Sequence, residues 1–188
     1  MLNESNSKSA RRTKHLFKDA LMRLLETESF ACISVKDIVD TADYNRTTFY
    51  NHYYDKFDLL DDITQELLDG FAESVRNSFK DYSLTQRKSM RASDITVFDY
   101  VYDNRRAISL CCQNQNEVQK KLTLKILDTI HRNLINSWTP IVNLTEKQIS
   151  SNARIFTYTL VGIIQEWMDE NFVTPPDEVR AAFVNYHN

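Results

Sequence analysis

Glycine and proline are scarce in this sequence, which contains two glycines and three prolines among 188 residues. β-Sandwiches and barrels need many turn residues, and α/β folds usually need glycine-rich loops between their strands and helices. Apolar residues instead recur every three or four positions along most of the chain, as they do on one side of an α-helix. The sequence therefore predicts an all-α protein of about nine helices.

The composition indicates a folded protein of the cytoplasm. Hydrophobic residues make up 42% and charged residues 26% of the chain, close to the average of globular proteins. The first residues, MLNESNSKSARRTK, lack the apolar core of a signal peptide, and no apolar run approaches the ~18 residues that span a bilayer. The three cysteines, two of them adjacent, fit neither a disulfide framework nor a C-x-x-C metal pattern. We therefore expect a cytoplasmic location and no membrane contact.

The motifs of common enzymes are missing from the sequence. It contains no G-x-S-x-G nucleophile motif, no G-x-x-x-x-G-K-[ST] phosphate loop and no H-E-x-x-H zinc motif. The four histidines, at positions 15, 52, 131 and 187, form no cluster with the spacing of metal ligands. We therefore expect no catalytic residues, no metal and no cofactor.

The N-terminal part of the chain is predicted to form four helices. Their approximate ranges are 9–28, 34–42, 45–52 and 55–79. Ser34 and Asp37 form a capping-box-like start, and Asn45 is a good N-cap residue. Only Asp43 and Tyr44 separate the second helix from the third, and both helices are too short to be stable alone.

A polar, aperiodic segment over residues 80–93 is expected to be a loop. Helical periodicity resumes after it. Further helices are expected over about residues 95–102, 108–112, 118–140, 145–168 and 175–186.

Positive charge is concentrated near the N-terminus. Residues 8–23 carry six basic side chains against one acidic side chain, although residues 1–60 as a whole are balanced. The whole net charge of −3 comes from the remainder of the chain. A local phosphate-binding surface needs such a concentration of basic charge, but a solvated amphipathic helix would show it too.

Two short helices with a tight turn between them and a longer helix on either side match the helix-turn-helix arrangement. In that arrangement the second short helix lies in the major groove of DNA. Here it carries several side chains that can hydrogen-bond to bases or phosphates, namely Arg46, Thr47, Thr48, Tyr50 and Asn51. A polar surface helix of an ordinary bundle would show a similar pattern, so the motif alone leaves both interpretations open.

The run ISVKDIVDTADYNRTTFYNHYYDKFDLL resembles the DNA-binding motif of TetR-type transcriptional regulators. The shared pattern is a capped short helix, a turn, a Ser/Thr-rich recognition helix, an aromatic-x-His segment and a Lys that opens the next helix. Tyr50, His52, Tyr53 and Lys56 occupy the matching positions. The resemblance covers roughly residues 10–70.

The sequence departs from this family pattern at two positions. Asp43 stands where Gly is usual, and we expect the turn to persist because Asp tolerates the left-handed conformation better than most residues. Thr47 stands where a Gly or another small residue is common. This second change is expected to alter which bases are read, and not whether DNA is bound.

The resemblance implies a role for each polar residue of the motif. Phosphate contacts, which fix the register on DNA, are expected from Ser34, Lys36, Tyr50, His52 and Lys56. Contacts to base edges are expected from Arg46, Thr47, Thr48 and Asn51. Arg11 and Arg12, at the N-terminal arm, are expected to enter the flanking minor groove. Phe49, Tyr53 and Phe57 are expected to pack against the bracing helices.

The segment ARIFTYTLVGIIQEWMDENFVTPPDEVRAAF resembles the last two helices of one C-terminal subtype of the same family. In that family these helices pair with their copies across a two-fold axis. The segment is apolar on more than one side, as homodimerisation requires, although a helix buried wholly within one chain would show the same pattern. The expected interface residues are Phe156, Leu160, Ile164, Trp167, Val179 and Phe183.

The family also implies a pocket for a small-molecule effector of unknown identity in the C-terminal helices. Its candidate lining residues are Phe71, Phe98, Tyr102, Cys111 and Ile126, each of which could equally be ordinary core.

We therefore predict a homodimeric regulator that binds double-stranded, palindromic DNA. It is expected to act as a repressor that an effector releases. The alternative is a helical adaptor of the same fold that acts through a partner protein. The expected division is a flexible arm (1–8), a helix-turn-helix DNA-binding domain (9–55, motif 34–53), a connecting helix (56–79) and a C-terminal regulatory and dimerisation domain (80–188).

Overall fold

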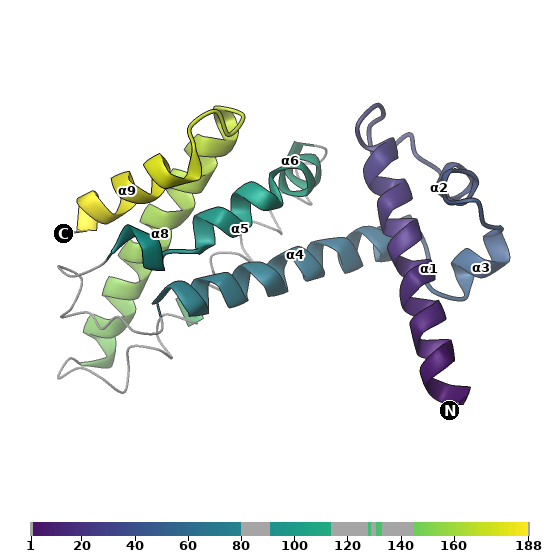
Figure 1. The fold of residues 1–188 in the computed structure, drawn as a ribbon, viewed down its shortest axis with the longest axis horizontal. Helices are drawn as coiled ribbons and strands as arrows, with labels where there is room; N and C mark the ends of the chain where they lie inside the picture. Colours follow the sequence, from purple (N-terminus) through teal and green to yellow (C-terminus); the bar gives the residue numbers. More distant parts are fainter. Residues whose placement is uncertain (1, 80–90, 114–127, 129–130, 133–144, 188) are drawn as a thin grey trace.

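The computed structural model of the protein describes residues 2–79, 91–113, 128, 131–132 and 145–187 (Figure 1). These residues form eight α-helices and one short 3-10 helix. The bounds are α1 Leu2–Leu24, α2 Val35–Ala42, α3 Arg46–Tyr50, α4 Lys56–Phe79, η2 Ala92–Asp94, α5 Val97–Asp103, α6 Arg105–Gln113, α8 Glu146–Asp169 and α9 Pro176–His187. The prediction of an all-α fold is thus confirmed for this part of the chain. Most of the expected helix at 118–140 and most of the expected loop at 80–93 lie outside it.

Helix α1 begins and ends earlier than predicted. It starts at Leu2, so the residues expected to form an arm continue the helix, since no proline or glycine interrupts the sequence there. The amides of Glu26 and Thr27 bond to carbonyls three residues back, and this tightening ends the helix before residue 28. Arg11 and Arg12 therefore lie on α1 and not on an arm.

The predicted caps set the limits of α2 and α3. Ser34 and Asp37 form a reciprocal capping box at the start of α2, and Asn45 caps α3. Asp43 ends α2 with φ 57° and ψ 46°, so the left-handed turn expected at this departure from the family pattern is present. The turn directs the chain from α2 into α3 within three residues.

The buried side chains form two separate clusters. The N-terminal core comprises the buried apolar side chains between Phe17 and Leu68, together with Cys111 of α6. The C-terminal core comprises the other buried apolar side chains between Phe71 and Val184. Figure 1 shows α1, α2 and α3 gathered at one end of α4, and α5, α8 and α9 beside the rest of it. Helix α4 therefore contributes to both cores and joins them.

Gly70 allows α5 to pack closely on α4. A Cβ atom at this position would lie 2.5 Å from the Tyr100 hydroxyl oxygen and 2.7 Å from carbons of its ring. The same hydroxyl donates a hydrogen bond to the Leu67 carbonyl at 2.9 Å. One of the two glycines is therefore needed for helix packing and not for a turn.

Helices α8 and α9 pack inward with the residues that the sequence assigned to a dimer interface. All six of them are buried in the C-terminal core of their own chain, which argues against their contacting a second copy. The apolar side chains of α8 pack against α4, α5 and α9 of the same chain, where packing against a second copy was expected. The exposed side of α8 instead carries Ile155, which is 63% exposed, and Tyr158, which is 59% exposed.

Candidate nucleic-acid interface

Helix α3 is held to the N-terminal core by one side chain. Phe49 is fully buried, and its ring centroid lies 5.3 Å from that of Phe17 on α1. It is the only buried residue of this five-residue helix. The remaining positions of α3 and its C-cap point outward, with four exposed side chains, namely Arg46, Thr47, Tyr50 and Asn51. The structure thus brings four of the predicted DNA-contacting residues onto one exposed surface.

Thr48 belongs to the helix cap as well as to this surface. Its backbone amide and its hydroxyl both donate to the Asn45 side-chain oxygen, at 2.8 and 3.0 Å. Because the hydroxyl proton is used within the protein, the groups that remain to read a base are its oxygen lone pairs and its methyl group. Thr47 is more exposed and makes no such cap contact, so it is the better placed of the two threonines.

The N-terminus of α2 differs from the expected phosphate site. Ser34 donates its hydroxyl to the Asp37 carboxylate at 2.6 Å, and its amide donates to the same oxygen at 2.8 Å. These hydrogen bonds hold the pKa of the Asp37 carboxyl below its usual value, so the carboxylate stays ionised. A phosphate beside Ser34 would therefore meet a negative charge, and the hydroxyl would have to leave Asp37 before it could donate to the phosphate.

Lys36 lies beside α3 but already has an acidic partner. Its ammonium group contacts the Asp40 carboxylate at 2.8 Å, and this hydrogen bond raises the pKa of Lys36. The positive charge of Arg46 acts in the opposite direction and lowers the pKa of Lys36. Both basic side chains are exposed, so they form the basic part of the surface around α2 and α3.

Lys56 is a structural cation in this protein. Its ammonium group donates to the backbone carbonyls of Phe30, Ala31 and Ile33, at 2.8, 3.2 and 2.6 Å. It also lies 4.7 Å from the centroid of the Phe30 ring. All three donors of an ammonium group are thus used by the segment that leads into α2. The prediction of a phosphate contact at Lys56 conflicts with this arrangement, because the carbonyls would lose their donor.

A polar network fixes α1 against α4. The Tyr53 hydroxyl donates to Asp62 at 2.8 Å, and Lys14 and Lys18 lie 3.4 and 3.3 Å from the same carboxylate. Burial and the contact with Asp62 raise the pKa of Tyr53. Burial opposes the ionisation of Asp62, but Tyr53 and the two lysines outweigh it and lower the pKa of Asp62. Tyr53 is therefore a core residue, as expected, and part of the basic N-terminal cluster serves this network.

The segment between α3 and α4 is more exposed than the sequence suggested. His52 is half-buried, with its ring 6.4 Å from that of Phe17. Phe57 touches Phe30 edge-on but remains 57% exposed, so its assignment to the core is wrong. Tyr54, which was not predicted as a site residue, is 85% exposed. The sequence does carry a signal for this exposure, because Tyr54 precedes α4 and lies outside the apolar periodicity of that helix.

The residues predicted to line an effector pocket do not come together. Phe71 and Phe98 are buried in the C-terminal core, and Tyr102 stacks on Trp167 at its edge. Cys111 lies in the N-terminal core instead, because α6 continues past α5 to reach it. Ile126 lies outside the described residues. The four described residues therefore do not define one common pocket.

Comparison with known proteins identifies the class. A TetR family model, described as transcriptional regulator C-terminal region, matches residues 89–187. The HTH-type transcriptional regulator YxbF of Bacillus subtilis (strain 168) is 24% identical over 170 residues, which are 86% of this chain and 41% of that protein. The chain thus spans less than half the length of this curated relative.

Two solved structures share the fold. DhaS, described as a dihydroxyacetone kinase operon activator, matches with a TM-score of 0.64 at 19% identity over 93% of both chains. NalD, described as the secondary repressor of the MexAB-OprM multidrug efflux pump in Pseudomonas aeruginosa, matches with a TM-score of 0.61 at 14% identity. That match covers 96% of this chain and 95% of NalD.

The chain belongs to the TetR family of transcriptional regulators. The proteins of this family are transcriptional regulators and not enzymes, in agreement with the sequence prediction. Among the described residues, no group of three or more His, Cys, Asp or Glu side chains is placed to hold a metal ion. No helix in the same part of the chain is long and apolar enough to cross a membrane.

Proposed function

We propose that this protein binds a specific DNA sequence through α3, as a homodimer on a palindromic operator, and represses transcription until a small effector releases it. The exposed surface of α3 is the observation that carries this proposal. Arg46, Thr47 and Asn51 present guanidinium, hydroxyl and amide groups suited to base edges, and Tyr50 lies beside them for a phosphate. Phe49 fixes the helix beneath them.

The proposed domains follow the two cores. Residues 9–55 form the DNA-binding domain, with the motif at 34–53, and residues 56–79 connect it to a regulatory and dimerisation domain at 80–188. The N-terminal core supports this division because it anchors α1, α2 and α3 to the first turns of α4. NalD, a repressor by its description, supports repression, whereas DhaS is described as an activator. Deletion of the gene should therefore raise transcription of its targets.

Two substitutions on α3 separate base reading from phosphate binding. The operator is first selected from a random DNA pool with the purified protein. Thr47→Ala should then reduce the preference for this operator over a variant at one base pair by about 1–3 kcal/mol. Tyr50→Phe should weaken binding to both DNAs by a similar factor, because it removes a contact that carries no sequence information. Fluorescence anisotropy on labelled duplexes measures both effects.

Asn77→Ala is the control for this experiment, because Asn77 is exposed and polar like Thr47 but lies in the last turn of α4. It should leave both affinities unchanged. Wild-type affinity and preference in both α3 variants would contradict the proposed roles.

The proposed dimer interface is the exposed side of α8. Ile155 and Tyr158 lie on this side, and Gly162 follows one turn later with open space around its Cα. An exposed apolar strip of this kind on a helix needs a partner. A two-fold dimer would also place two copies of α3 one DNA turn apart, about 34–36 Å, which is the reason to expect a palindrome.

Ile155→Asp should convert the dimer into a monomer, because each interface would bury an unpaired carboxylate. Sedimentation velocity gives the mass directly. Arg76→Ala is the control, since Arg76 is an exposed arginine on α4 and should leave the mass unchanged. A dimer that persists in Ile155→Asp would place the interface elsewhere.

An adaptor that acts through a partner protein is the second candidate. The observation in its favour is the acidic character of α2, where Asp37 and Asp40 neighbour Lys36 and Asp43 is exposed. The salt dependence of DNA binding distinguishes the two functions. A DNA reader loses affinity steeply as salt rises, because its phosphate contacts release counterions, whereas an adaptor shows no specific DNA affinity at any salt concentration.

A further inference from the structure

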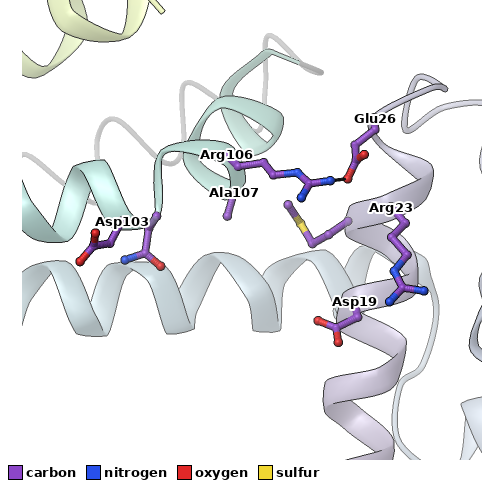
Figure 2. A pocket seen from close by; sticks show the side chains of 8 residues that line it. Asp19, Arg23, Glu26, Asp103, Arg106 and Ala107 are labelled. Atoms are coloured by element: carbon purple, nitrogen blue, oxygen red, sulfur yellow. Dashed lines mark hydrogen bonds and ion pairs between the residues drawn. The ribbon is translucent and has the colours of Figure 1, made fainter. Parts of the chain in front are cut away.

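A cavity of about 400 Å³ lies between α1 and the segment formed by α5 and α6 (Figure 2). Three of its lining residues belong to α1, Glu26 follows the end of α1, and four belong to the α5–α6 segment. One wall therefore belongs to the proposed DNA-binding domain, and the other belongs to the proposed regulatory domain. None of the residues predicted from the sequence to line an effector pocket lies in this lining.

An ion pair joins the two walls. Arg106 extends from α6 and donates to the carboxylate of Glu26, which follows the end of α1, as Figure 2 shows. The guanidinium charge of Arg106 is therefore compensated within the protein. The other guanidinium of the lining belongs to Arg23, whose side chain is exposed to solvent and whose charge is screened.

The remaining polar groups of the lining are mainly hydrogen-bond acceptors. Asp19 contacts the exposed His15 through Oδ2 only, at 3.4 Å, so its Oδ1 can accept from a ligand. The Asn104 amide nitrogen donates one hydrogen bond to the Tyr100 carbonyl at 2.9 Å, and its side-chain oxygen can accept from a ligand. Asp103 adds a second carboxylate on the α5 side. Three carboxylates and two guanidiniums give the lining an excess of one negative charge.

Two of the lining side chains are apolar. Met22 of α1 and Ala107 of α6 belong to the lining and can cover a short alkyl chain. The volume lies at the small end of the range for ligand sites. From this geometry we propose that the cavity binds a small aliphatic diamine, with one ammonium group at Asp19 and the alkyl chain between Met22 and Ala107.

A ligand in this cavity touches both walls, so it favours the arrangement of α1 and α6 in which the walls have this spacing. An ammonium group near Glu26 also competes with Arg106 for the carboxylate. The use of the diamine as a regulatory signal rests on the proposed function, whereas its binding does not.

Isothermal titration of the full-length protein with putrescine, at low salt and without DNA, tests the site. One putrescine should bind per chain, and 1,4-butanediol, which has the same chain length without the charges, should not bind. Asp19→Asn should weaken putrescine binding about tenfold or more, because it removes the charge and keeps the shape. Ala107→Phe should abolish binding by filling the cavity. Asp169→Asn, at the exposed end of α8, should bind putrescine like the wild type.

Either of two results would overturn the proposal. One is the absence of saturable putrescine binding to the wild type, and the other is equal affinity in the wild type and Asp19→Asn. Circular dichroism establishes that each variant is folded, and the comparison of putrescine with butanediol on the wild type needs no variant. Because no DNA is present, failure here leaves the proposed function untouched.

Discussion

Phe49→Ala is expected to destabilise the N-terminal core by about 3–5 kcal/mol and to abolish specific DNA binding. The Phe49 ring is fully buried and contacts Phe17 and Tyr53, with ring centroids 5.3 and 5.7 Å away. A helix of five residues has no stability of its own, so α3 depends on this single anchor. The loss is large beside the total stability of a typical domain, about 5–15 kcal/mol.

Phe57→Ala supplies the matched control, because it removes the same atoms from a ring that is 57% exposed. It should change the free energy of unfolding by about 1 kcal/mol or less, since an exposed ring loses an edge contact with Phe30 and the Lys56 ammonium group 5.7 Å from its centroid. Urea unfolding measures the free energies, and anisotropy on the selected operator measures DNA binding. Equal destabilisation by the two substitutions would show that α3 does not depend on Phe49.

Local sequence signals predicted the helix-turn-helix motif because its structure is decided locally. Ser34 and Asn45 cap the helices that they were expected to cap, and Asp43 adopts the left-handed turn. Each of these choices depends on hydrogen bonds within about four residues, which a sequence pattern can display. The inward direction of Phe49 followed in the same way from its place among polar neighbours.

The roles of Lys56 and α8 could not be predicted, because contacts distant in the sequence decide them. Lys56 reaches carbonyls that lie 23 to 26 residues earlier in the chain, so its local pattern was equally compatible with a phosphate contact. Helix α8 shows apolar residues on several sides, but periodicity does not reveal which side the same chain covers. The structure assigns Phe156 and Leu160 to the inside and leaves Ile155 outside. The same limit applied to Cys111, since the path of α6 decides which core it joins.

Trp167→Ala is expected to destabilise the C-terminal core by about 3–5 kcal/mol. The indole is buried, stacks on Tyr102 with centroids 5.7 Å apart, and lies 5.2 Å from the Phe172 ring. Its N–H group donates to the Thr174 carbonyl at 2.8 Å and thereby fixes the connection to α9. Phe172 has a φ of 57°, a strained conformation for a bulky residue, and Trp167 supports it through the ring contact and a 2.8 Å backbone hydrogen bond.

Trp167→Phe separates packing from hydrogen bonding. It keeps a ring in the core but leaves the Thr174 carbonyl without its donor, for an expected loss of about 1–3 kcal/mol. Val173→Ala, at an exposed position in the same connection, should stay within about 0.5 kcal/mol of the wild type. Urea unfolding gives the three values. An order other than Trp167→Ala, Trp167→Phe, Val173→Ala would contradict the role assigned to the indole.

Hydrogen exchange then tests whether the two cores unfold separately. Trp167→Ala should reduce amide protection in α5, α8, α9 and the second half of α4, because these helices share the C-terminal core. The amides of α1, α2 and α3 should keep their protection, since none of their side chains belongs to that cluster. Equal loss of protection in all helices would instead show that α4 couples the two cores into one cooperative unit. In that case a change in the regulatory part would reach α3 through α4 itself.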